Sequence, residues 1–381
     1  KKKINNSIIF PSLGFFIIMI FIPKIDLLPI AGYWQGIRAE DILILAFLLS
    51  FISNLDNSIY HDNFRYKSFL IFFIYIFISN LAAVLSGAEV KIILLIRFFE
   101  YIVLLYYFDN FEIDKIKLKK ILYVYLLLNF FVASLQYFEI LGSISSLGYM
   151  KNEGNNPMGI TGGPWELGAV SSIIFFILYI IENKQRNLII TFIIVNFLLI
   201  LASGRGNFIA FNAAIFILFL FNPKIENNKK FFYIVVLCIL ILVIKNYIFI
   251  DFFTKIFGIN LKYMITLFYE AIFLNELPTR DELENMQIYL SFWYRVKDWS
   301  MFINQVTEDN LNILFGLGLS HVYYDSLLIR LFVSTGIFGV VIALILSLKL
   351  RMYLLIFFLL SGAFLDLFVS MKIYFFTLLM L

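Results

Sequence analysis

The chain has 381 residues, of which 62% are hydrophobic and only 15% are charged. A soluble globular domain typically carries about 25% charged residues, so this composition excludes an ordinary soluble protein. The formal net charge of +4 is small, and the positions of the charges are more informative than their sum. No nucleotide-binding fingerprint is present in the sequence, and no nucleic-acid partner is predicted.

Apolar runs of about 20 residues recur along the chain, and that length lets a helix cross a hydrocarbon core of roughly 30 Å. We therefore predict one all-α integral membrane domain over residues 1–381, a polytopic transmembrane helical bundle of about 11–12 spans. The expected spans are residues 7–23, 37–53, 68–86, 90–108, 121–142, 167–182, 188–202, 207–222, 231–250, 326–348, 352–365 and 367–381. The last two are also compatible with one broken helix.

The basic residues predict the orientation of these spans. If the N-terminus is cytoplasmic, alternate connectors all contain Lys or Arg, as the positive-inside rule requires. These cytoplasmic connectors contain Lys1, Lys2 and Lys3; Arg65 and Lys67; Lys115, Lys117, Lys119 and Lys120; Lys184 and Arg186; Lys224, Lys229 and Lys230; and Lys349 and Arg351.

This topology leaves two long segments outside the membrane. Residues 143–166 form a loop rich in turn-forming Asn, Gly and Pro. Residues 251–325 form a much larger segment, and loops of that length are usually functional. Within it, the stretch Asp298–Asp309 has apolar residues at helical spacing, which is typical of a helix lying on a surface; these are Trp299, Phe302, Ile303 and Val306.

Arg205 stands in the short connector Ser203-Gly204-Arg205-Gly206, which this topology places outside. Positive charge belongs on the cytoplasmic side, so an arginine held tightly at the opposite face indicates an anion to bind. The flanking glycines allow a sharp turn, and a guanidinium binds phosphate through paired hydrogen bonds. The alternative is a side chain that reaches lipid headgroups; we favour the anion site.

Two further arginines lie in the large outer segment. Arg295 follows a Trp-Tyr pair at its membrane-proximal end and is a candidate ligand for the same anion. The alternative is a headgroup anchor, because Trp and Tyr are typical of the membrane interface. Arg280 is also a candidate for substrate binding, although the Asp-Glu pair beside it equally indicates an ordinary solvated ion pair.

His321 is a candidate general base. It is followed by Tyr324, a candidate substrate contact, and by Asp325, which shares a helical face with His321 at i, i+4. A carboxylate beside an imidazole orients the ring and raises its basicity, which suits removal of a hydroxyl proton. A histidine and an aspartate that merely stabilise the end of a helix are the alternative.

Other charged residues lie within or close to the expected spans. Arg97 and Glu100 are three residues apart in one span, where a charged pair usually faces the protein interior or a wet cavity. They are either a structural pair or part of a phosphate site. Arg330 lies about one turn inside its span and is a candidate substrate ligand of the same kind.

Acidic residues mark the starts of two expected helices. Glu166 lies where the loop 143–166 enters a span, so it either stabilises the helix N-terminus or contacts sugar hydroxyls. The pair Glu40-Asp41 resembles an acidic metal site, but the same helix-end effect accounts for it. We predict no metal and no cofactor.

Several segments resemble, in order, the O-antigen polymerase (Wzy) family and the related O-antigen ligases. The resemblance covers roughly residues 160–345, and its motifs stand on the predicted outer side. The matching segments are Leu201-Ala202-Ser203-Gly204-Arg205-Gly206-Asn207, Arg295 with Trp299, Phe315-Gly316-Leu317-Gly318, Tyr324-Asp325-Ser326-Leu327-Leu328 and Thr335-Gly336-Ile337-Phe338-Gly339.

The resemblance implies a GT-C-type glycosyltransferase of the bacterial inner membrane with its active site facing the periplasm. Such enzymes take a saccharide from a polyprenyl pyrophosphate and use no nucleotide sugar. Outward-facing arginines on two segments, and in the ligases a histidine near the last large loop, are functional in these families. Arg205, Arg295 and His321 match those positions.

We therefore expect an O-antigen or related polysaccharide polymerase. Its partners would be a lipid-linked oligosaccharide donor and acceptor, the lipid bilayer, and a chain-length regulator protein. One alternative is an O-antigen ligase, which transfers glycan to the lipid A core. Another is a lipid-linked oligosaccharide flippase or other transporter, which would show polar residues along many spans. A structural or channel-like protein would leave the large outer segment unexplained.

Overall fold

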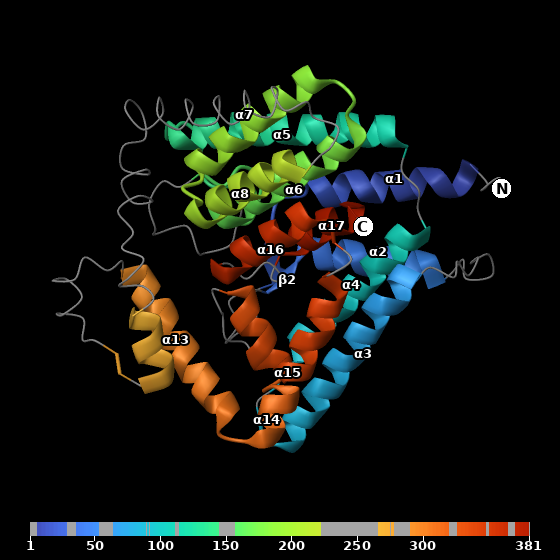
Figure 1. Cartoon of the computed structure of the whole chain (residues 1–381). Coiled ribbons are helices and arrows are strands. Elements are labelled where there is room, and N and C mark those ends of the chain that lie inside the picture. The colour runs from blue at the N-terminus through green and yellow to red at the C-terminus, as the bar shows by residue number, and fades with distance from the viewer. Residues whose placement is uncertain are drawn as a thin grey trace. The chain divides into compact units, whose positions relative to one another are not determined.

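The computed structural model describes residues 6–28, 36–52, 64–88, 90, 92–110, 114–144, 157–221, 266–274, 276–277, 290–319, 326–347, 350–364 and 370–380. This part of the chain is mainly helical (Figure 1). It divides into two compact units. Unit 1 contains Lys1–Leu70, Ile96–Phe211 and Leu367–Leu381, and unit 2 contains Ile71–Leu95 and Asn212–Asp366.

Helices occupy the expected spans wherever those spans fall on described residues. This follows from their continuous apolar character, because a helix satisfies all of its backbone groups internally. The helices are α1 (Asn6–Phe21), α2 (Ala39–Ile52), α3 (Phe64–Leu85), α4 (Ile92–Asn110), α5 (Lys115–Tyr137), α6 (Pro164–Ile181), α7 (Gln185–Leu201), α8 (Arg205–Phe221), α15 (Leu327–Ser347), α16 (Met352–Phe364) and α17 (Met371–Met380).

Three of these helices, α5, α6 and α15, are long and apolar enough to cross a membrane. Shorter apolar helices include the later part of α3 together with α7, α8, α16 and α17. The expected span at 231–250 lies outside the described residues. The all-α class is therefore confirmed for the described residues, apart from one small sheet.

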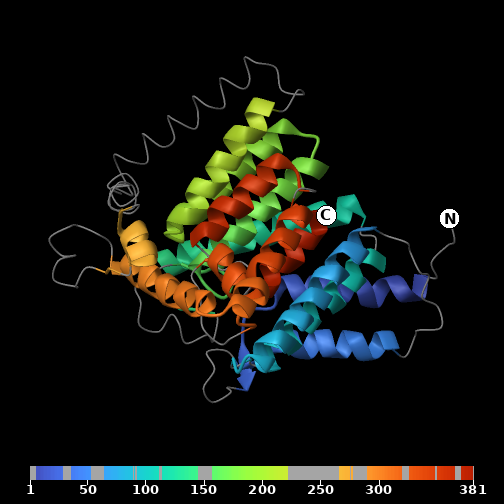
Figure 2. The ribbon, with the colours of Figure 1, turned by 60° about the horizontal axis from the view of Figure 1, so that its bottom comes forward.

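Helix α6 is the centre of unit 1. It packs against α5, α7 and α17 (Figures 1 and 2). Its side chains are buried almost continuously from Glu166 to Leu178. The Phe175 ring meets the Phe192 and Phe211 rings in edge-to-face contacts, which are favourable arrangements for aromatic pairs. A helix buried on all sides is the expected outcome for a sequence that is apolar on all faces.

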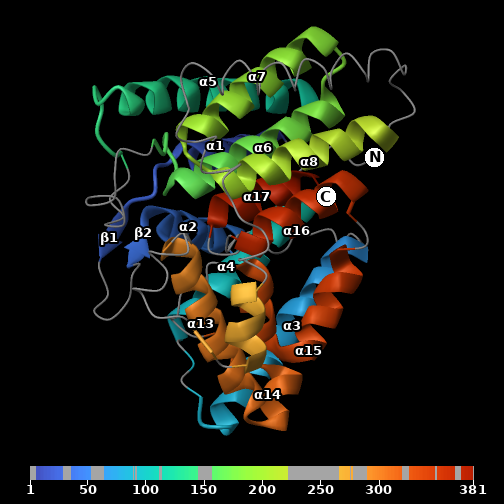
Figure 3. The same ribbon diagram turned by 60° about the vertical axis from the view of Figure 1, so that its left-hand side comes forward.

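A short antiparallel sheet precedes α2 and was not expected from the sequence. Strands β1 (Asp26–Leu28) and β2 (Ile37–Arg38) pair with Asp26 opposite Arg38 (Figure 3). Such short strands lack the alternation of apolar and polar residues that identifies a strand in a sequence. The sheet leads directly into α2 and fixes the position of Arg38.

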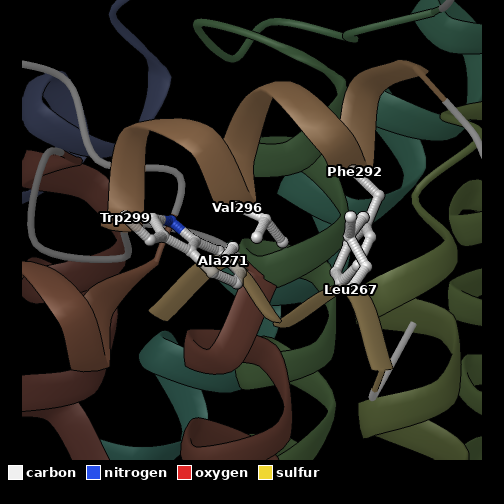
Figure 4. Close-up of a cluster of buried hydrophobic side chains, with 5 residues drawn as sticks. All are labelled: Leu267, Ala271, Phe292, Val296 and Trp299. Carbon is white, nitrogen blue, oxygen red and sulfur yellow. The ribbon is translucent and has the colours of Figure 1, made fainter. Parts of the chain in front are cut away.

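Unit 2 contains the amphipathic helix predicted in the large outer segment, although it begins earlier than expected. This is α13 (Leu290–Thr307). Its Phe292, Val296 and Trp299 pack against the helix at 266–274, whose last five residues form the π-helix η3 (Glu270–Leu274) (Figure 4). The next turns of α13 pack against α15. Other side chains of unit 2 therefore cover these apolar residues of α13.

Two glycine-containing segments of unit 2 cross at close range, after α14 (Asn310–Phe315) and within α15. Gly316 and Gly336 have φ of 79° and 63°. A Cβ at Gly336 would lie 2.4 Å from the carbonyl carbon of Leu314, and a Cβ at Gly316 would lie 2.4 Å from that of Ser334. Backbone hydrogen bonds of 2.7 and 3.1 Å join the two segments. Only glycine allows this approach.

Side chains of α3 stabilise this crossing. The Tyr75 hydroxyl donates to the carbonyl oxygen of Thr335 at 2.6 Å, and the Ser79 hydroxyl lies 2.5 Å from the carbonyl oxygen of Phe315 and 3.0 Å from that of Ser334. Gly336 is non-helical, so α15 is kinked there and loses part of its internal hydrogen bonding. Polar side chains from a neighbouring helix satisfy the released carbonyls, which makes such a break tolerable in a lipid environment.

Candidate functional site

The described structure gathers buried charged residues at one end of unit 1, around Glu166. This carboxylate is fully buried in the first turn of α6. Lys24 places its Nζ 3.6 Å from Glu166 Oε1, and both side chains are excluded from solvent. The Ser370 hydroxyl donates to the same oxygen, and the backbone N–H of Gly162 donates to Oε2.

Lys372 extends this cluster from the start of α17. Its Nζ donates to the carbonyl oxygen of Ile160 at 3.2 Å, and the side chain is only 4% exposed. The ammonium also interacts electrostatically with the carboxylates of Glu166 and Glu40. We call Lys24, Glu166, Ser370 and Lys372, with the backbone groups they bind, the Glu166 network.

Arg38 and Glu40 form a second buried pair in unit 1. Arg38 Nη1 donates to Glu40 Oε1 at 2.9 Å. The backbone N–H of Arg38 donates to Asp41 Oδ2 at 2.8 Å, next to the start of α2. The two carboxylates of the Glu40-Asp41 pair therefore bind different groups of one arginine. This geometry favours the helix-end interpretation of these acidic residues over a shared metal site.

The loop before α6 is held in place by polar side chains of α5. Gln136 Oε1 accepts hydrogen bonds from the backbone N–H groups of Met158 and Gly159, each at 2.9 Å. Asn129 Oδ1 accepts from the N–H of Ile160 at 3.0 Å. A loop can be buried only when its backbone groups find such partners. The segment 157–163 is thus a rigid wall of the Glu166 network.

Gly162 allows Lys24 to reach Glu166. A Cβ at position 162 would lie 2.3 Å from Cδ of Lys24 and 2.9 Å from Glu166 Oε2. Any larger residue would displace the lysine from the carboxylate that balances its charge. The contact between Lys24 and Glu166, which are far apart in sequence, therefore requires a glycine at position 162.

Arg205 lies at the same end of unit 1. It is the first residue of α8 and is half-buried. Two residues later, Asn207 donates from Nδ2 to the carbonyl oxygen of Trp165 at 2.7 Å, which ties the start of α8 to the residue before Glu166. The structure thus joins the helix that begins at Arg205 to the residue next to Glu166 in sequence.

The turn before Arg205 differs in detail from the expectation. Ser203, not either glycine, has the left-handed conformation, with φ of 51°. Gly204 has only ordinary contacts at its missing Cβ, the nearest atom being 3.8 Å away. Helix α7 ends at Leu201 and α8 begins only a few residues later, so the strain of the tight turn falls on Ser203.

The opposite end of α6 carries a separate charged group at Glu182. Its carboxylate accepts hydrogen bonds from Tyr123, Asn187 and the backbone N–H of Lys184, between 3.0 and 3.1 Å, and Lys119 Nζ lies 3.4 Å away. Burial raises the pKa of Glu182, but these hydrogen bonds and the nearby ammonium outweigh burial and lower its pKa to about 2. The sequence predicts that this end is cytoplasmic.

The other predicted site residues are not shown to join Glu166 and Arg205. Arg97 lies on α4 in unit 1, one turn from the buried Glu100, and only its backbone is described. Arg295 on α13 and Arg330 on α15 are half-buried residues of unit 2. Four further candidates lie outside the described residues: Arg280, His321, Tyr324 and Asp325.

Lys24, Arg38, Ser370 and Lys372 were not predicted as site residues. A signal for two of them exists in the sequence, because Lys24 lies in the expected outer connector and Arg38 lies at the outer end of the next span, as basic residues on the same side as Arg205. Lys372 falls inside the expected span 367–381, where a charged residue is itself a candidate for a site. Ser370 has no comparable signal, since a serine at the start of a helix is ordinary.

No protein-family model matches the chain, and no curated protein or solved structure matches it either. The described fold defines a class, a helical protein with three helices long and apolar enough to cross a membrane. The resemblance to polysaccharide polymerases stays a prediction carried by the sequence motifs. Two of those motifs, at 315–318 and 335–339, meet in the glycine crossing of unit 2. The close approach of the two backbones accounts for one glycine in each motif, Gly316 and Gly336.

Proposed function

We propose that the protein is a membrane glycosyltransferase that polymerises a polysaccharide. It would transfer a growing glycan from polyprenyl pyrophosphate to a hydroxyl of the next lipid-linked repeat unit, at the periplasmic face of the inner membrane. One observation supports this most: Arg205 begins a helix at the end of unit 1 where the buried charges gather. A helix N-terminus and a guanidinium together favour a phosphate.

In the proposed reaction, the acceptor hydroxyl forms a new bond to C1 of the donor sugar while the bond between C1 and the pyrophosphate oxygen breaks. The pyrophosphate leaves with the bonding electrons, and the acceptor proton goes to a base, for which His321 is the sequence candidate. Arg205 would stabilise the charge that develops on the leaving group. The products are the extended glycan, polyprenyl pyrophosphate and a proton.

The central experiment measures glycan extension by purified protein in detergent, with lipid-linked saccharide from the source strain. A polymerase extends the saccharide although no membrane separates two compartments, whereas a flippase does not. In cells, deletion of the gene should leave single repeat units on the lipid A core, and naked core would instead indicate a ligase. Absence of extension in detergent would contradict the proposal.

Arg205→Ala should lower the extension rate by about 10²–10³-fold, because one preorganised charged donor is lost. Arg205→Lys should recover part of the rate, since an ammonium keeps the charge but not the paired geometry. Arg186→Ala is the matched control, because Arg186 is exposed and lies next to the opposite end of α7. Equal rates for the two alanine variants would remove Arg205 from the site.

A further inference from the structure

Trp165 is the one partly exposed residue in a long buried stretch. From residue 157 to residue 178, every other side chain is buried. The stretch includes the loop wall and most of α6, and Trp165 directly precedes Glu166. A large aromatic ring that reaches the surface from otherwise buried surroundings is available for contact with a ligand.

The ring is held on two sides by residues of the same unit. Lys24 Nζ lies over one face, 5.8 Å from the ring centroid. At the other contact, a Cβ on Gly163 would lie 3.0 Å from Nε1, so the pyrrole edge packs closely on this glycine. Asn207 fixes the backbone by donating to the Trp165 carbonyl oxygen at 2.7 Å. The ring is nevertheless partly exposed.

These contacts suit a sugar. The C–H groups on one face of a pyranose ring are apolar and pack on an aromatic face, while its hydroxyls bind nearby polar groups. Lys24 covers the other face and is a buried member of the Glu166 network. An aromatic ring and a cation site for phosphate would then stand at one end of one unit, as a saccharide attached to pyrophosphate requires.

We propose that Trp165 binds a sugar ring of the lipid-linked saccharide by stacking, beside the pyrophosphate site at Arg205. This inference rests on the proposed function and adds the residue that recognises the saccharide. The competing role is an interfacial anchor, for which Trp is also typical. An anchor contacts lipid whether or not sugar is present, so dependence on sugar separates the two roles.

The test compares binding of two probes to purified full-length protein in detergent: undecaprenyl pyrophosphate without sugar, and the lipid-linked saccharide extracted from the source strain. Trp165→Leu should weaken binding of the saccharide-bearing carrier by roughly 5- to 30-fold and leave binding of the sugar-free carrier within about twofold. Trp165→Phe should retain most of the affinity, because a smaller aromatic face remains.

The matched control is Trp293→Leu. Trp293 is likewise partly exposed and has Lys297 Nζ over its ring at 5.3 Å, but it belongs to unit 2. The Trp293→Leu substitution should not change binding of either carrier. Equal losses for Trp165→Leu and Trp293→Leu, or equal loss of both carriers in Trp165→Leu, would overturn the inference.

Intrinsic fluorescence provides a measurement that does not depend on the leucine variant folding. Addition of the saccharide-bearing carrier should change the tryptophan emission of the unaltered protein and of Trp293→Phe, but not that of Trp165→Phe. If the unaltered protein binds both carriers equally well, the inference fails and the proposed pyrophosphate site stands. If it binds neither carrier, the proposed function fails and this inference fails with it.

Discussion

The Glu166 carboxylate joins three segments of unit 1 that are far apart in sequence. It receives hydrogen bonds from Ser370 and Gly162 and lies 3.6 Å from the Lys24 ammonium. Each buried ion would be costly alone, because burial removes its hydration. Glu166 supplies the negative charge that faces the two ammoniums of the network, Lys24 and Lys372, so loss of this balance should cost more than loss of an exposed ion pair.

Glu166→Gln tests this balance. The amide keeps the shape but removes the charge that faces Lys24 and Lys372, so we expect unfolding in detergent to become easier by about 3–5 kcal/mol. Glu308→Gln is the control, because Glu308 is exposed. Adding Lys24→Met to Glu166→Gln should recover part of the loss. If Glu166→Gln unfolds at the same temperature as Glu308→Gln, the Glu166 carboxylate does not stabilise the buried ammoniums.

At the scale of elements, the kink of α15 depends on two glycines and on hydroxyl groups of α3. Most of the residues of this helix are apolar and would allow it to continue straight. Gly336 instead adopts positive φ, and the backbone after α14 occupies the space where a side chain would stand. The hydroxyls of Tyr75 and Ser79 then donate to the carbonyl oxygens of Thr335 and Ser334 at the break.

Gly336→Ala should therefore destabilise the protein by more than about 3 kcal/mol, through φ strain together with overlap of the new methyl group with Leu314. The comparison is Gly14→Ala in α1, where no atom lies within 4 Å of the missing Cβ. That change should be neutral or slightly stabilising, because alanine is the better helix former. Thermal unfolding in detergent measures the stability of both variants. Similar unfolding temperatures for Gly336→Ala and Gly14→Ala would show that the two glycine segments are not closely packed.

The sequence predicted the helices well but not the contacts between them. Continuous apolar runs identify helices because the requirement acts within each segment. The Ser370 to Glu166 hydrogen bond spans 204 residues, and no local pattern carries that information. Arg205 and Glu166 were found because charge is rare in such a chain. The sheet pairing Asp26 with Arg38 was missed because its strands are too short to show a period.

At the scale of the whole molecule, the orientation of α5 and α6 can be measured directly. The basic residues predict that Lys184 is cytoplasmic and that Gly142, beyond the other end of α5, is outside. Both positions are exposed, and Gly142 has open space around its missing Cβ. In a background with Cys238→Ser, a single cysteine at either position reports its side of the membrane.

Gly142→Cys should react with a membrane-impermeant maleimide in intact cells, once the outer membrane has been made permeable. Lys184→Cys should react only after the inner membrane is opened. The chain has a single native cysteine, so the background without Cys238 should give no labelling. Labelling of Lys184→Cys from outside would invert the topology and place Arg205 and Glu166 on the cytoplasmic side.

The place of α17 in unit 1 has a consequence for how the protein is made. Ser370 is translated 204 residues after Glu166. At bacterial and eukaryotic elongation rates of about 5–20 residues per second, this separation corresponds to roughly 10–40 s. During that interval the ribosome produces the whole of Asn212–Asp366. Until then Glu166 has Lys24 as its partner but lacks the hydroxyl donor from Ser370, so a chain that stalls before α17 leaves a carboxylate oxygen without that hydrogen bond, which quality control can detect.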